Sequence, residues 1–174
     1  DLVPGLGEAQ FKHLEQRYAK SLAEMRTDYL QAKPEERQKA SIKRASERAE
    51  SMYGRLDDAQ RKLIAAGIAA SPFDPEAWLQ ERQRRQADIV QTLRRLVAER
   101  ADRDRIVAAM RAQAERIERS PDPDYRRYQQ TLTEFNCGLA AQVHNSTSPE
   151  QRKHAQAKLK GWEDDLRSLI AAPQ

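Results

Sequence analysis

The stretch FKHLEQRYAKSLAEMRTDY at residues 11–29 places an apolar side chain at every third or fourth position. The apolar positions are Phe11, Leu14, Tyr18, Leu22, Met25 and Tyr29. This spacing puts the side chains on one stripe of an α-helix, whereas a half-buried strand would alternate at every second residue. The stretch therefore predicts a long amphipathic helix.

The same period recurs along the rest of the chain. Further stripes lie at residues 42–56, 63–68, 78–96, 106–117, 128–143 and 155–169. The breaks between them fall at Pro34 and at residues 71–75, 101–104, 120–124 and 145–149, most of them rich in Pro, Ser and Asp. No stretch alternates with period two, so we expect an all-α fold, an elongated bundle of six or seven helices. We expect one helical domain over residues 1–174, with residues 118–124 as its natural place of subdivision.

The composition favours helices with a narrow core. Hydrophobic residues make up 39% of the 174 residues, charged residues 33% and aromatic residues 6%. The net charge of +4 is a small difference between 31 basic and 27 acidic residues, so most charges are expected on solvated helix faces. This balance makes nucleic acid an unlikely partner.

Two helix starts share a motif. Leu56-Asp57-Asp58-Ala59-Gln60 is similar to Thr147-Ser148-Pro149-Glu150-Gln151, and Lys33-Pro34-Glu35 begins a looser third copy. Asp57 and Ser148 stand where an N-cap is needed, and each glutamine falls at the third helical position, so both segments predict a capping box. The motif also resembles the Leu-Thr-x-x-Gln repeats of the Spy/CpxP group of all-helical periplasmic proteins, which includes an ATP-independent chaperone.

A second resemblance covers roughly residues 10–170. It is carried by Met52-Tyr53-Gly54-Arg55-Leu56, by Trp78-Leu79-Gln80-Glu81-Arg82, and by Leu159-Lys160-Gly161-Trp162-Glu163-Asp164-Asp165-Leu166. In this order the segments resemble a family of uncharacterised proteobacterial lipoproteins that carry a domain of unknown function. The resemblance implies a periplasmic protein tethered to a membrane by an N-terminal lipid-bearing cysteine, of which the sequence given would be the soluble part. It carries no functional residues.

The residue types that support catalysis are scarce. The histidines at positions 13, 144 and 154 lack the spacing of a metal motif, although His144 and His154 flank one turn. Cys137 lies between Phe135 and Leu139, and we expect a buried, inert thiol. We therefore predict no catalytic residues, no metal site, no cofactor and no enzymatic activity.

The remaining candidates are residues that could bind. Arginines at 82, 84, 85, 94, 95, 100, 103 and 105 alternate with carboxylates, which indicates a salt-bridged surface more than a nucleic-acid site. The candidate binding surface comprises Trp78, Arg82, Arg85, Tyr125 and Tyr128, where charge would attract a partner and apolar contacts would hold it.

The resulting hypothesis is a non-enzymatic, periplasmic lipoprotein that binds a protein partner or an unfolded client, in the manner of a chaperone. Two alternatives stay open at this stage: a structural protein that docks on one envelope partner, and a cytoplasmic helical module that binds nucleic acid. Long apolar stripes also allow a homodimer.

Overall fold

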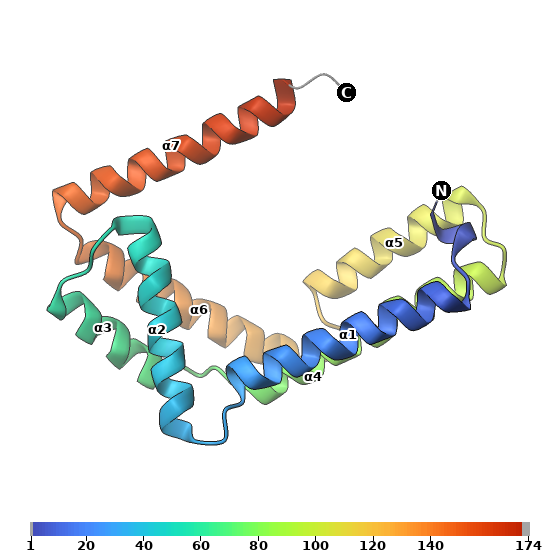
Figure 1. Cartoon of the computed structure of the whole chain (residues 1–174), viewed down its shortest axis with the longest axis horizontal. Coiled ribbons are helices and arrows are strands. Elements are labelled where there is room, and N and C mark those ends of the chain that lie inside the picture. Colours follow the sequence, from blue (N-terminus) through green and yellow to red (C-terminus); the bar gives the residue numbers. More distant parts are fainter. Residues whose placement is uncertain (1, 172–174) are drawn as a thin grey trace. The chain divides into compact units, whose positions relative to one another are not determined.

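The computed structural model describes residues 2–171, and these form an all-α protein (Figure 1). Its seven α-helices follow one 3-10 turn, η1 (Val3–Gly5). The helices are α1 (Glu8–Tyr29), α2 (Pro34–Tyr53), α3 (Asp58–Ala69), α4 (Pro75–Ala98), α5 (Arg103–Glu118), α6 (Pro123–Asn145) and α7 (Pro149–Ala171). No strand occurs among these residues, so the predicted fold class and helix number are confirmed. Within the described range no helix has the length and apolarity needed to cross a membrane.

The helices group into two compact units, and the division falls within α6. Unit 1 joins the residues up to Ala32 with Phe73–Leu132, and unit 2 joins Lys33–Pro72 with the residues from Thr133 onward. The segment 118–124 lies inside unit 1, away from these divisions. That the chain is one domain stays a prediction.

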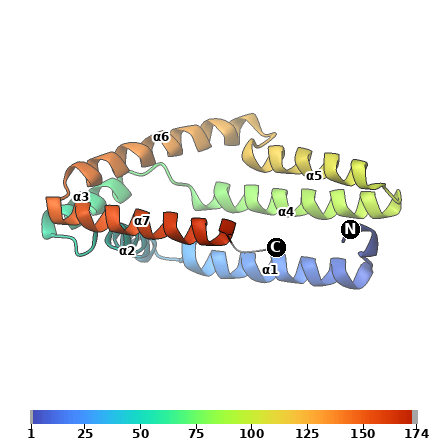
Figure 2. The ribbon, with the colours of Figure 1, turned by 90° about the horizontal axis from the view of Figure 1, so that it is seen from above.

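Unit 1 is built around α4. Helix α1 runs antiparallel along one side of α4, and α5 returns antiparallel along another, as Figure 2 shows. Phe11, Leu79 and Leu96 are buried in this unit. At one end of α4 the Trp78 ring lies 5.1 Å from that of Tyr29, and the Phe73 ring lies 6.2 Å from each of them.

The interface between α4 and α5 contains a network of polar side chains. Gln113 is 4% exposed and donates to Asp88 at 3.1 Å, while Arg116 donates to the same carboxylate at 2.8 Å. Thr92, also buried, lies 3.4 Å from Gln113. Buried polar groups are tolerated when they bond one another, and this network meets that requirement.

Unit 2 has a small apolar core. Leu56, Ile64 and Val143 form its buried centre, with Ala45, Ala49, Tyr53, Leu63, Ile68 and Leu139 packed around them. Gly67 makes this packing possible, because a Cβ atom there would lie 2.4 Å from Leu139 Cδ1. Helix α2 ends at Gly54, whose φ of 77° is open to glycine at little energetic cost.

The expectation for Cys137 was wrong: its side chain is exposed. Phe135 and Leu139 are both half-buried and share one face of α6. Cys137 stands two residues from each, about 200° around the helix. Although Cys137 lies between two core-facing residues in the sequence, it therefore lies on the opposite face of the helix.

Candidate binding surfaces

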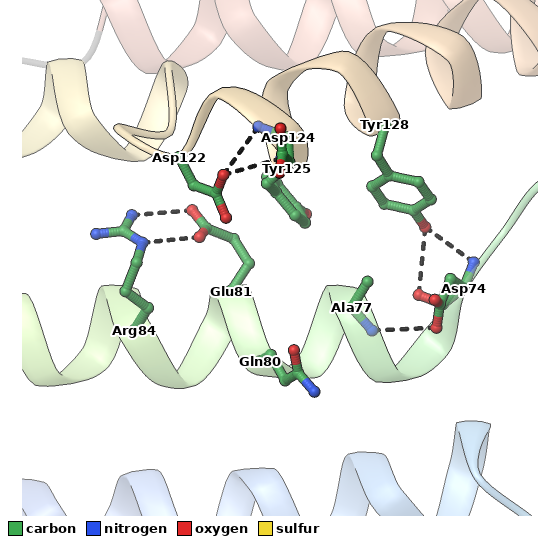
Figure 3. A pocket seen from close by; sticks show the side chains of 9 residues that line it. All are labelled: Asp74, Ala77, Gln80, Glu81, Arg84, Asp122, Asp124, Tyr125 and Tyr128. Atoms are coloured by element: carbon green, nitrogen blue, oxygen red, sulfur yellow. Dashed lines mark hydrogen bonds and ion pairs between the residues drawn. The ribbon is translucent and has the colours of Figure 1, made fainter.

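A hollow of about 470 Å³ lies between the first half of α4 and the first turns of α6, both in unit 1 (Figure 3). Its lining residues are Asp74, Ala77, Gln80, Glu81, Arg84, Asp122, Asp124, Tyr125 and Tyr128. Four of these side chains are carboxylates and one is a guanidinium, so the hollow is acidic in formal charge.

Two capped helix starts frame the hollow. Asp74 accepts hydrogen bonds from the backbone N–H groups of Glu76 and Ala77 at 2.9 and 3.1 Å, which begins α4. Asp122 does the same for Asp124 and Tyr125 at the start of α6, at 2.8 and 3.3 Å. One oxygen of each of these two carboxylates therefore serves as the helix cap.

The caps place two tyrosines one helical turn apart on α6. Their rings lie 5.5 Å apart between centroids. The Tyr128 hydroxyl accepts from the backbone N–H of Asp74 at 3.0 Å and donates to its carbonyl at 3.2 Å, which ties α6 to the start of α4. Burial raises the pKa of both Tyr125 and Tyr128, so both hydroxyls stay protonated at neutral pH.

Glu81 is the buried charge of the hollow. The residue is only 5% exposed, and Arg84 and Arg85 donate to its carboxylate at 2.7 and 2.8 Å. Burial alone would raise the pKa of Glu81, but hydrogen bonds from these two arginines and from Ser120 outweigh it, so the pKa is lowered. Glu81 is thus an anion at neutral pH.

Of the five predicted binding residues, Trp78, Arg82 and Arg85 are on α4, and Tyr125 and Tyr128 are on α6. Tyr125 and Tyr128 line the hollow, and the Arg85 guanidinium lies 6.0 Å from the Tyr125 ring centroid. Trp78 belongs to the aromatic cluster with Tyr29, and Arg82 lies 3.5 Å from Ser21 of α1. Trp78 and Arg82 thus contact α1 and Arg85 contacts α6, and a single binding surface made of all five residues stays a prediction.

The arginine-rich segment is salt-bridged, as its interleaved carboxylates predicted. Arg94 binds Glu8 at 2.6 Å and Glu15 at 3.2 Å, and Arg105 binds Glu99 at 2.8 Å. With Arg84 and Arg85 held by Glu81, much of the segment's positive charge is neutralised locally.

The second candidate surface is on α7, in unit 2. Ala155 is buried, but the apolar stripe then continues into solvent along the rest of the helix. The exposed fractions are 52% for Leu159, 48% for Trp162, 61% for Leu166, 74% for Leu169 and 85% for Ile170. We call these five residues the α7 face. Sequence periodicity finds the stripe but does not tell which part of it lacks a covering helix.

Two glutamines fix the start of α7 on unit 2. Gln60 and Gln151 bind each other reciprocally, with Nε2 to Oε1 distances of 2.8 and 3.0 Å. Each Nε2 also donates across to a carbonyl, Gln60 to Ser146 at 3.0 Å and Gln151 to Arg55 at 2.9 Å. We call this pair the glutamine clasp.

Both predicted capping boxes are confirmed, and the clasp is built on them. Gln60 Oε1 accepts from the N–H of Asp57 at 3.0 Å, and Gln151 Oε1 accepts from that of Ser148 at 2.9 Å. The backbone N–H of each glutamine in turn donates to the cap side chain, Gln60 to Asp57 at 2.8 Å and Gln151 to Ser148 at 3.2 Å.

The histidines beside the clasp have structural partners. His144 Nδ1 lies 3.0 Å from the Tyr53 hydroxyl, and His154 Nδ1 lies 3.0 Å from the carbonyl oxygen of Met52. Over residues 2–171, no group of three or more His, Cys, Asp or Glu side chains is arranged to hold a metal ion.

Comparison with known proteins gives one match. The sequence model of a protein family described as a family of unknown function (DUF6279) matches residues 1–126, which is more than half of the chain. The match includes the hollow's α4 side and ends before α7. No curated protein and no solved structure matches the chain.

Proposed function

The chain belongs to this family of unknown function, and we propose that it acts by binding other proteins, with the α7 face as the binding surface. The observation that carries the proposal is the exposure of five large apolar side chains in a row on one helix. Soluble monomers rarely leave such contiguous apolar surface open, and where they do it commonly marks an interaction site.

The dimensions of the face suit a helical or extended apolar segment. From Leu159 to Leu169 the helix rises about 15 Å at 1.5 Å per residue, which presents about three turns to a partner. Trp162 lies near the middle of this length, and a large aromatic anchor is the residue type most often found to dominate binding energy. Helix-in-groove recognition uses anchors with this spacing.

A chaperone-like role in the cell envelope is part of the proposal. It is supported by the similarity of Leu56-Asp57-Asp58-Ala59-Gln60, and of Thr147-Ser148-Pro149-Glu150-Gln151, to the Leu-Thr-x-x-Gln repeats, and by the lipoprotein resemblance of the sequence. The envelope location is tested by the intact mass and membrane fractionation of the full-length gene product, which should carry acyl chains on an N-terminal cysteine. An unmodified, cytosolic protein would refute the location without touching the binding role.

The binding role is tested with a single substitution on the face. Leu166→Glu places a charge at the centre of the face at a 61% exposed position, so the fold is expected to survive. With reduced insulin as an aggregating client at equimolar ratio, the unaltered protein should suppress light scattering. The variant should lose most of this effect, because burying an unpaired charge costs several kcal/mol.

The matched control is Val107→Glu, which adds the same charge at a 37% exposed apolar position on α5. It should leave the suppression unchanged. If the unaltered protein has no effect on the client, the chaperone-like role is wrong. A protein that is inactive on the client but captures one envelope protein through the α7 face would instead be a docking protein.

A further inference from the structure

We draw no further inference here: the strongest candidate, the exposed apolar face of α7, carries none because the acidic and basic side chains beside it balance and nothing in the structure shows what covers it.

Discussion

The glutamine clasp shows how two short polar side chains can join helices that are far apart in sequence. Gln60 is 2% exposed, yet each hydrogen-bonding group of its carboxamide has a partner. Gln151 repeats the same four-bond pattern from the other helix start. Each glutamine therefore serves its own cap and the opposite one, and removal of either leaves buried groups of the other unpaired.

This arrangement predicts a large effect of Gln60→Ala on unit 2. The substitution removes the cap bond from the Asp57 N–H, both bonds with Gln151 and the bond to the Ser146 carbonyl, so Gln151 keeps only its bonds with Ser148 and Arg55. Unsatisfied buried groups cost about 1–3 kcal/mol each, so the unfolding free energy of unit 2 should fall by about 2–4 kcal/mol. Hydrogen exchange of peptides from α3 and from the first turns of α7, followed by mass spectrometry, measures this value.

Gln10→Ala is the matched control. Gln10 Oε1 accepts from the N–H of Gly7 at 3.0 Å, which is the same cap bond at an exposed helix start without a partner across the fold. Its loss should lower the stability of unit 1 by no more than about 1 kcal/mol. Equal effects of the two substitutions would show that the cross-bonds contribute nothing.

At the scale of the helices, most boundaries could be predicted, because the signals that set them are local. Asp74 with Pro75 begins α4, Pro34 begins α2 and Asp57 caps α3, as the sequence indicates. What could not be predicted is which helix faces meet. Gln60 and Gln151 are separated by 91 positions, and neither cap signal identifies the other as its partner.

The second half of α7 lacks packing partners within the described part of the chain, so its stability should depend on the helix propensity of its own residues. The contacts of α7 with the rest of unit 2 come from its first turns, such as His154 with Met52 and Lys158 with Ser51. Beyond them the helix is exposed, and an unpacked helical segment of this length is marginal in water. Gly161 lies at the start of this exposed part, and a Cβ atom there would meet nothing within 4 Å.

Gly161→Ala should therefore stabilise the second half of α7 by about 1 kcal/mol, the difference in helix propensity between the two residues. Amide exchange over residues 162–171 should slow by about fivefold. Gly67→Ala on α3 makes the same propensity gain but forces Leu139 to move, so overpacking of about 1–3 kcal/mol should make unit 2 less stable. An unchanged exchange rate in Gly161→Ala would mean that the exposed part of α7 is held by something other than its own propensity.

At the scale of the whole molecule, the two units differ in how they hold their charges. The carboxylates Glu81 and Asp88, whose pKa values are lowered inside the fold, are in unit 1, together with the exposed Glu8. Hydrogen bonding from Arg116 is the main cause at Asp88. In unit 2 the pKa is lowered at Glu150, which is fully exposed. Glu81 lines the hollow between α4 and α6, and no local sequence pattern indicates that these two helices meet.

Acid should therefore weaken unit 1 more than unit 2. A carboxyl group with a pKa lower in the folded than in the unfolded state stabilises the fold above its unfolded pKa, about 4.3 for glutamate, and this contribution is lost as the pH falls through the folded pKa. In a Trp162→Phe background, Trp78 fluorescence reports on unit 1 alone, and the urea midpoint of its unfolding should drop clearly between neutral pH and roughly pH 3.

The Glu81→Gln substitution should lower the free energy of unfolding of unit 1 at neutral pH by about 1–3 kcal/mol, and with it the urea midpoint. It should also make the midpoint less dependent on pH, because the titrating carboxyl group is gone. Glu150→Gln, which removes an exposed carboxylate from unit 2, should leave the Trp78 curve unchanged at every pH. A Glu81→Gln protein with the same pH dependence as the unaltered chain would show that the buried Glu81 pairs do not govern the acid stability of unit 1.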